Sequence, residues 1–300
     1  MEVRYNHFNS WLKNKFGERT LKICIDGCFS CPNRDGTCGE GGCIFCGERG
    51  SGENTKRISI PQQVQNHLSG YKGQRANKFI AYFQNFSNTY ASVEVLKEKY
   101  DSALIDNRIV ALAVATRPDC IDENIANLLA TYSSKYYVYV ELGLQVASDD
   151  IGKLINRGYT TEQFVSAVNI LKSHNIDVVV HIMVGLPNET EKDLKETIKL
   201  INNLKVMGIK VHSTYVIKNT KLCEMYNNKK YIPLTLENYV NAVSDIVSWL
   251  DPSIVICRIS GDAPKNLLVV PEWNLHKKII INSINKKLEE NNIYQGCLKQ

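Results

Sequence analysis

The cysteines are the residues of this chain whose type and spacing point most directly to chemistry. The 300 residues include ten cysteines, and four of these lie within sixteen positions, from Cys31 to Cys46. Cys24 and Cys28 lie just upstream. The amino-terminal segment is charged and lacks the apolar core of a signal peptide, so we expect a protein of the reducing cytoplasm. In that compartment, closely spaced thiolates bind metals or act in redox chemistry more often than they form disulfides.

Two kinds of metal site fit the spacing of these cysteines. Cys43 and Cys46 form a C-x2-C pair, which occurs in zinc sites and in iron–sulfur sites alike. Cys28 and Cys31 form a second such pair, so a structural zinc ion with four thiolate ligands is one alternative. The other is a [4Fe-4S] cluster on Cys31, Cys43 and Cys46, which leaves one iron open to a further ligand. The loop follows the first predicted strand of a large domain, which favours the cluster, because structural zinc usually lies in a small ribbon or finger.

Two alternating sequence patterns predict the elements that position this loop. Short runs rich in β-branched and aromatic residues predict buried strands at 21–26, 79–84, 109–116, 136–144, 178–185, 210–217 and 253–260. Amphipathic helical patterns lie between them, and the one at 190–207 begins with a capping box of Thr190 and Asp193 and is expected to end at Gly208. About six β–α units and a seventh strand predict a parallel α/β fold, either a barrel or an open sheet. The active site is then expected at the carboxyl ends of the strands, where the cysteine loop begins.

Composition and charge set the protein class and leave the partner open. A chain that is 44% hydrophobic and 22% charged can bury a sizeable core. It contains no run of about 18 apolar residues, so we expect no membrane span. The net charge of +5 allows an anionic partner without requiring one. Residues 1–22 and residues 264–300 each carry a net charge of +3. We divide the chain into an amino-terminal extension (1–22), a core domain (23–262) and a carboxy-terminal helical extension (263–300).

Several longer motifs carry a resemblance to a known family. The motifs "ATRPD" (115–119), "ELGLQ" (141–145), "INRGYT" (155–160), "HIMVGLP" (181–187) and "YVIKNTKL" (215–222) resemble the radical S-adenosylmethionine (radical SAM) superfamily, in the subgroup of the Elongator catalytic subunit. The C-x11-C-x2-C spacing is wider than the superfamily's usual C-x3-C-x2-C but is similar to that subgroup's. The stretches "DGCFSCPNRDGT" (26–37), "GGCIFC" (41–46) and "CRISGDAP" (257–264) resemble the YtqA/MnmL (YhcC-like) family more closely. This resemblance covers about residues 4 to 296.

The resemblance implies both the fold of the core and its cofactors. The core is expected to be the partial (β/α)6 barrel, of the TIM type, that radical SAM proteins share. A [4Fe-4S] cluster on Cys31, Cys43 and Cys46 would bind S-adenosyl-L-methionine through the open iron. The reduced cluster would cleave it to methionine and a 5′-deoxyadenosyl radical, which takes a hydrogen atom from the substrate. Cys24, Cys28 and Cys38 match positions that are not cysteines in the family, so they are left outside the cluster.

Candidate contacts to S-adenosylmethionine are polar residues near predicted strand ends. Glu141 and Gln145 qualify, because a carboxylate and an amide in a buried strand are costly without partners, although both could serve the structure alone. Gln84 and Asn85 are placed similarly after the second predicted strand, or they simply end it.

Three further residues are assigned to the cofactor by the same resemblance. Arg157 is a candidate clamp for the methionine carboxylate, because a guanidinium matches carboxylate geometry. His181 either lines the site or is a core histidine. Gly185 would allow the backbone to approach the ligand closely, in a turn that resembles the family's adenine contact.

The family resemblance also implies a substrate and partners. The substrate would be tRNA with 5-carboxymethylaminomethyl-(2-thio)uridine at the wobble position, and the product its 5-aminomethyl form. The expected partners are a reductant such as flavodoxin or ferredoxin and a tRNA methyltransferase that uses the product. The alternatives are a radical SAM enzyme with another substrate and a zinc-stabilised RNA-binding module without catalysis.

Overall fold

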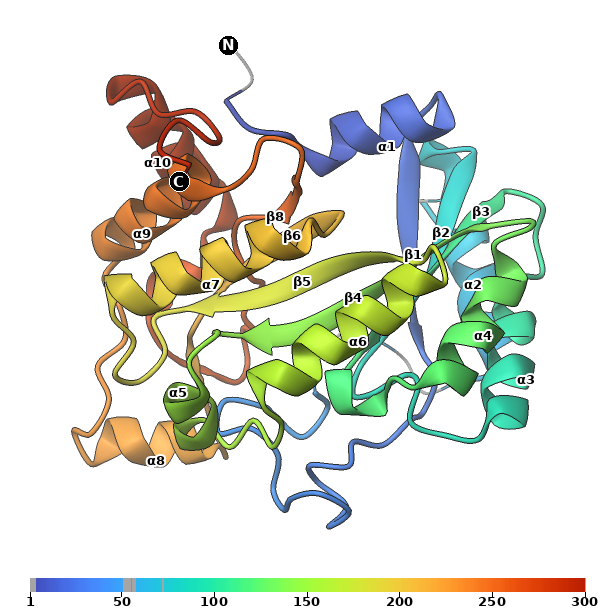
Figure 1. Cartoon of the computed structure of the whole chain (residues 1–300), viewed down its shortest axis with the longest axis horizontal. Helices are drawn as coiled ribbons and strands as arrows, with labels where there is room; N and C mark the ends of the chain where they lie inside the picture. The colour runs from blue at the N-terminus through green and yellow to red at the C-terminus, as the bar shows by residue number, and fades with distance from the viewer. Residues whose placement is uncertain (1–3, 51–54, 56–57, 72, 300) are drawn as a thin grey trace.

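A curled sheet of seven parallel strands forms the centre of the protein (Figure 1). The structure is a computed structural model that describes residues 4–50, 55, 58–71 and 73–299. The strands lie in the order β1-β2-β3-β4-β5-β6-β8 and every neighbouring pair is parallel. Their bounds are Thr20–Asp26 (β1), Lys78–Gln84 (β2), Ile109–Thr116 (β3), Tyr137–Gln145 (β4), Asp177–Val184 (β5), Gly208–Ser213 (β6) and Val255–Arg258 (β8). The sheet forms a partial barrel, which confirms the predicted fold class.

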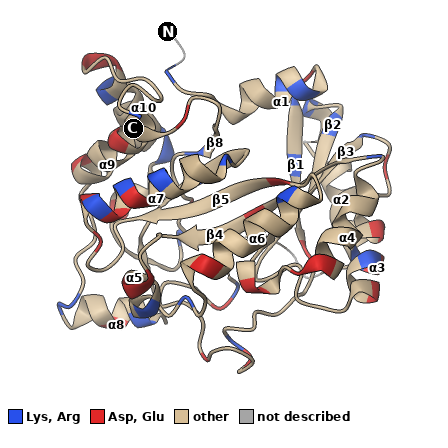
Figure 2. Cartoon of the chain, in the orientation of Figure 1, with Lys and Arg blue, Asp and Glu red and all other residues tan. Residues whose placement is uncertain are grey.

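Helices cover the outer face of the sheet and bury its apolar side chains. They are α2 (Ile60–Ser69), α3 (Val93–Ala103), α4 (Glu123–Tyr132), α6 (Thr161–Ser173), α7 (Glu191–Leu204) and α9 (Leu236–Trp249), and Figure 1 shows α6 and α7 crossing in front of β4 and β5. Val140 of β4 and Val180 of β5 are fully buried in one cluster with Phe164 of α6. The opposite side of each helix is polar, and Figure 2 shows charges of both signs along α7. Burial of this apolar surface is the main force that holds helices and sheet together.

The predicted start of α7 is confirmed, but its predicted end is wrong. Thr190 and Asp193 form the expected capping box, with each side chain bound to the other residue's backbone N–H. The helix ends at Leu204 and the left-handed residue after it is Lys205, with φ 48°. Gly208 begins β6 instead. A Cβ atom there would lie 2.8 Å from the carbonyl oxygen of Val255, so close packing of β6 against β8 requires the glycine.

The predicted strand at 210–217 is two strands in the structure. β6 ends at Ser213, and the Thr214 N–H still donates to the carbonyl of Val184 on β5. The chain then leaves the main sheet, and β7 (Val216–Ile217) pairs antiparallel with β9 (Leu268–Val270) in a separate two-stranded sheet. A continuous apolar pattern does not reveal such a change of partner.

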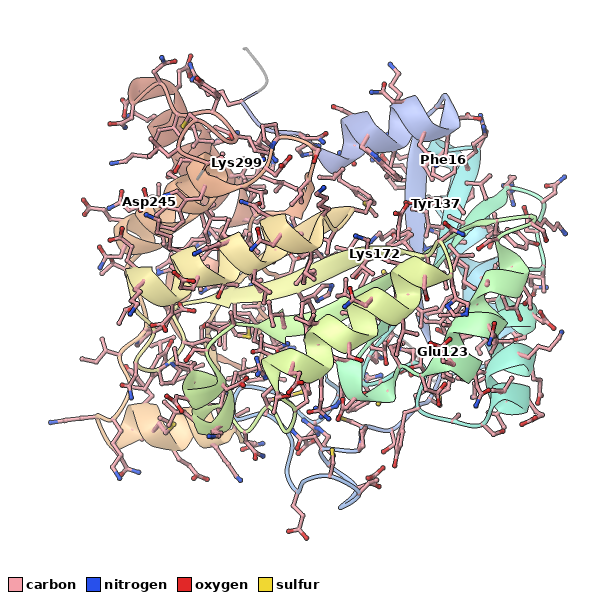
Figure 3. The ribbon with its side chains drawn as sticks, in the orientation of Figure 1. Phe16, Glu123, Tyr137, Lys172, Asp245 and Lys299 are labelled. Carbon is pink, nitrogen blue, oxygen red and sulfur yellow. The ribbon has the colours of Figure 1, made fainter. Side chains whose placement is uncertain are left out.

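Both terminal segments pack on the barrel. Helix α1 (Phe8–Phe16) lies between the edge strands β1 and β8 (Figure 1), and its Leu12 is buried in a cluster with interior residues of the sheet. Phe16 at its end contacts the ring of Tyr137 of β4 at 6.1 Å between centroids (Figure 3). Helix α10 (Lys277–Glu290) packs against α9. The domain boundaries at 22/23 and 262/263 remain a prediction.

Among the described residues, no helix is both long enough and apolar enough to cross a membrane.

Replacing Leu12 with Ala should lower the free energy of unfolding by about 2–5 kcal/mol, because the variant leaves a cavity where α1 meets the barrel interior. The matched control is Lys13→Ala, whose side chain is exposed in the same helix. Urea denaturation followed by circular dichroism measures both. Equal stability of the Leu12 variant and the wild type would show that α1 does not support the barrel.

Candidate active site

A cavity of about 250 Å³ opens at the carboxyl ends of the strands. Its walls come from the cysteine loop after β1 and from the interior faces of β2 to β6. Seven of the ten residues predicted for the site line it: Cys31, Cys43, Cys46, Asn85, Glu141, Gln145 and His181. The other three, Gln84, Arg157 and Gly185, do not. Ligands of parallel α/β proteins bind at this end of the strands.

The cysteine loop is held in place by hydrogen bonds to two short helices. Ile44, between the two cysteines of the C-x2-C pair, donates its N–H to the carbonyl of Ile155 after α5 (Asp149–Leu154) at 3.0 Å. Its own carbonyl accepts the N–H of Leu222 in α8 (Lys221–Asn227) at 2.9 Å. The buried amide of Asn33 donates to the carbonyl of Asn156 at 2.7 Å. These contacts fix the C-x2-C pair against the rim of the barrel.

The three thiols that face the cavity lie close enough to affect one another. Burial raises the pKa of Cys43 to about 12, and the neighbouring Cys46 and Cys31 raise it further. Arg117, whose side chain also lines the cavity, acts in the opposite direction. Such thiols become ligands when a cationic centre stabilises their thiolate forms.

The arrangement of these thiols fits an iron–sulfur cluster better than a zinc ion. Within the described parts of the chain, there is no group of three or more His, Cys, Asp or Glu side chains that could together hold one metal ion. Cys28, the fourth ligand of the zinc alternative, is exposed, has a φ of 54° and does not line the cavity. In a cluster each thiolate binds a different iron, so Cys31, Cys43 and Cys46 need not meet at one point. The Cys38 thiol instead contacts Asp119 at 3.6 Å and lies outside the cavity.

Two polar residues at strand ends point their side chains toward this cavity. Asn85, with φ 77°, is buried and donates to the Thr55 hydroxyl at 2.8 Å. Its Oδ1 has no hydrogen-bond partner among the described residues, which leaves an acceptor for a ligand. Gln145, with φ 62°, accepts from the Tyr159 hydroxyl at 2.7 Å. Phe86 also lines the cavity with a positive φ, of 55°, and left-handed backbone at three non-glycine residues of one cavity is costly and is typical of functional sites.

Glu141 lies deeper in the barrel and all its contacts are within the protein. Its side chain is fully buried, and its oxygens accept from the Lys22 ammonium at 2.7 Å and the Tyr82 hydroxyl at 2.7 Å, from the His181 Nε2 at 2.8 Å, and from Lys210. Burial opposes ionisation, but Lys210 and Lys22 outweigh it and hold the pKa of Glu141 well below its usual value. The carboxylate therefore organises the interior of the barrel, and its oxygens are already occupied.

Sequence reasoning missed most of the residues around Glu141. Lys22, Tyr82, Glu141, His181 and Lys210, together with the neighbouring His212, form what we call the cavity floor. Lys22 and Lys210 are charged residues in apolar strands, which is the signal that drew attention to Glu141. Lys22 lies in the first predicted strand, but in the sequence it contributes only to the net charge of residues 1–22. Burial lowers the pKa of His181 to about 4, so its ring is neutral at pH 7.

Arg157 has a structural role, and its predicted role as a carboxylate clamp is wrong. Its side chain has no exposed surface. The guanidinium donates to the carbonyls of Leu144 and Val146 at 2.9 and 2.7 Å, and to the carboxylate of Asp149 at 2.7 Å. A third carbonyl, that of Tyr159, accepts its Nε–H. Arg157 therefore fixes the turn after β4, and no donor is left for a ligand.

Gly185 and Gln84 also lie outside the cavity. Gly185 has a φ of 89° and donates its N–H to the Glu189 carboxylate at 2.6 Å, and the two residues line a separate depression beside α9. Burial raises the pKa of Glu189 to about 8. Gln84 is half-buried at the last position of β2. The positions of these residues give no support for contacts to a ligand in the main cavity.

Comparisons with known proteins agree with this geometry. The chain is 39% identical over 300 residues to a protein named YtqA from Bacillus subtilis (strain 168), with 98% of this chain and 92% of that protein covered. It is 29% identical over 200 residues to the tRNA uridine(34) acetyltransferase of Methanocaldococcus jannaschii, with 65% of this chain and 35% of that protein covered.

A solved structure has the same fold. The archaeal Methanocaldococcus infernus Elp3 with an amino-terminal deletion matches with a TM-score of 0.71 at 19% identity, with 92% of this chain and 64% of that chain covered. The radical SAM superfamily matches residues 31–201, and the radical SAM carboxy-terminal domain matches residues 206–290. The cysteine loop, the partial barrel and these matches lead to one conclusion: the chain belongs to the radical SAM superfamily.

Proposed function

We propose that this enzyme cleaves S-adenosylmethionine reductively and modifies the wobble uridine of tRNA, converting 5-carboxymethylaminomethyl-(2-thio)uridine to its 5-aminomethyl form. The observation that carries the proposal is that Cys31, Cys43 and Cys46 face one cavity together with polar strand-end residues. Similarity to YtqA over nearly the whole chain supports membership of the family whose resemblance implies this substrate.

Different residues of this chain would bind the cluster, contact the cofactor and exclude water in such a reaction. Cys31, Cys43 and Cys46 would hold a [4Fe-4S] cluster, which, with bound S-adenosylmethionine, supplies a 5′-deoxyadenosyl radical that takes a hydrogen atom from the substrate. Asn85 and Gln145 offer amide groups to the cofactor at the mouth of the cavity. The wall also includes small or apolar side chains such as Ala115 and Met183, which would help to exclude water from the reacting groups.

The tRNA assignment rests on relatives and on charge. The M. jannaschii relative is named for uridine 34 of tRNA, and the alignment covers 65% of this chain. The positive ends of the chain, each with a net charge of +3, suit a polyanionic partner. After loss of a hydrogen atom from the methylene of the arm, loss of one electron to an acceptor would give an imine. Hydrolysis of the imine by water would release the two carbons as an aldehyde acid and leave a primary amine on the base, which a tRNA methyltransferase could use. A flavodoxin or ferredoxin would supply the electron.

Cysteine variants test the cofactor. Replacing Cys31, Cys43 or Cys46 with Ala should each abolish the anaerobically reconstituted cluster, because a cluster with three protein ligands cannot lose one. Iron and sulfide content and the brown absorption measure this. Cys38→Ala is the matched control in the same loop and should keep its iron. A colourless wild-type protein with one zinc ion per chain, or iron loss only in the Cys38 variant, would contradict the ligand set.

A gene deletion tests the substrate. Mass spectrometry of nucleosides from digested tRNA should show accumulation of 5-carboxymethylaminomethyluridine, with or without the 2-thio group, and loss of the aminomethyl nucleosides derived from it. Complementation with the wild-type gene should restore the profile, whereas the Cys43→Ala gene should not. An unchanged nucleoside profile in the deletion strain would remove the tRNA assignment and leave a radical SAM enzyme with another substrate.

A further inference from the structure

The cavity floor contains more positive than negative charge. Lys22 of β1 and Lys210 of β6 both bind Glu141, whose single carboxylate can balance one of them. Arg258 of β8 lies near enough to affect the floor, but it is paired with Asp262 at 3.4 Å. Buried charges are normally paired, because an unpaired charge out of water is costly. One ammonium group of the floor therefore lacks a full counter-charge.

Lys210 is the more deeply buried of the two lysines that share Glu141. Burial, helped by Lys22 and Arg258, lowers the pKa of Lys210 to about 7, whereas Glu141 overcomes burial and raises the pKa of Lys22. The Lys210 side chain is 7% exposed and Lys22 is 20% exposed, so Lys210 is also the less hydrated of the two. Lys210 lies directly behind the cavity wall, because it contacts the hydroxyl of Tyr82 at 3.2 Å and the carboxylate of Glu141.

A second polar group at the floor has no partner. His212 lies two residues after Lys210 on β6, so their side chains share the interior face of the sheet. Its ring lies 5.1 Å from that of His181, it lines the cavity, and its buried Nε2 has no hydrogen-bond partner among the described residues. Burial lowers the pKa of His212 well below its usual value, so the neutral ring carries one N–H. With that proton on Nε2, the ring would donate to an acceptor oxygen of a ligand.

The floor is deep in the barrel. Glu141 precedes Gln145, the last residue of β4, by four positions, which corresponds to about 13 Å along the strand. The cysteine loop lies beyond the strand ends. A cofactor held by the cysteines would therefore lie toward the mouth of the cavity and would leave the floor to the substrate.

We propose that the cavity floor, through His212 and the charge of Lys210, binds a carboxylate group of the substrate. This inference rests on the proposed function, in which the substrate carries a carboxymethylaminomethyl arm. A carboxylate at the floor would place the methylene carbon between the carboxylate and nitrogen of that arm above the floor, toward the cofactor. The floor would also distinguish the substrate from the aminomethyl product, which has no carboxylate.

Two variants separate the charge from the hydrogen bond. Lys210→Met keeps the length of the side chain and leaves Glu141 paired with Lys22, so the variant removes the excess positive charge of the floor. His212→Phe keeps an aromatic ring beside His181 and removes the nitrogen atoms. Lys199→Met is the control, because Lys199 is an exposed lysine on the outer helix α7. Circular dichroism and iron content confirm that each variant is folded and loaded.

The first measurement needs neither tRNA nor turnover. Sarcosine has the same N-substituted glycine structure as the arm, and sarcosinamide is its uncharged-amide counterpart. At constant ionic strength, sarcosine should raise the Tm of the wild type and of Lys199→Met more than sarcosinamide does, because a ligand that binds the folded state stabilises it. Lys210→Met and His212→Phe should lose this difference. Equal shifts for the two probes in the wild type, or an unchanged difference in both floor variants, would overturn the inference.

The second measurement identifies which carboxylate binds, since the methionine part of the cofactor also carries one. Each floor variant should lose about tenfold to a hundredfold in the kcat/KM for conversion of carboxymethylaminomethyl tRNA, in line with the loss of one charged hydrogen bond. The KM for S-adenosylmethionine in uncoupled cleavage should be unchanged. A raised KM for S-adenosylmethionine would assign the floor to the cofactor and overturn the inference. If the wild type converts no tRNA but still prefers sarcosine, the tRNA assignment fails and the carboxylate site is supported.

Discussion

The barrel interior depends on the ionised carboxylate of Glu141. Lys22 from β1 and Lys210 from β6 bind it from strands that are not neighbours of β4 in the sheet. Tyr82 of β2 and His181 of β5 donate to the same group. An ionised carboxylate out of water must be paired and hydrogen-bonded. The pairing thus fixes the spacing of five strands of an open barrel, whose edge strands β1 and β8 have no direct contact through backbone hydrogen bonds.

This interior arrangement separates two chemical environments within one cavity. The thiols of Cys31, Cys43 and Cys46 lie at its mouth. There the backbone of Ile44 forms hydrogen bonds with Ile155 after α5 and with Leu222 of α8, and these bonds hold the loop. The floor is polar and positively charged. Between them, the wall is lined partly by small and apolar side chains. A reactive species formed at the mouth would meet a substrate group held at the floor, and the protein's main contribution would be position and the exclusion of water.

The sequence predicted the parallel strands well, because they follow from local patterns, and the cysteine set remains a prediction. Hydrophobic runs located β3 at its observed bounds, and the capping box located the start of α7 at Thr190. Contacts between distant segments were not predictable. Arg157 has the right chemistry for a carboxylate clamp, but the carbonyls that converge on it come from the far side of a turn. The contact of Lys210 with Glu141 is visible only in the structure, where β6 and β1 each bring a lysine to the same carboxylate.

The central claim is that the three thiols hold a cluster with an open iron that faces this cavity. Electron paramagnetic resonance of the anaerobically reconstituted, dithionite-reduced protein, recorded with and without S-adenosylmethionine, tests it most directly. The account predicts the signal of a reduced [4Fe-4S] cluster whose g-values shift when S-adenosylmethionine is added, because the ligand changes the environment of the open iron. A protein without such a signal, or a spectrum that is identical with and without S-adenosylmethionine, would contradict the claim.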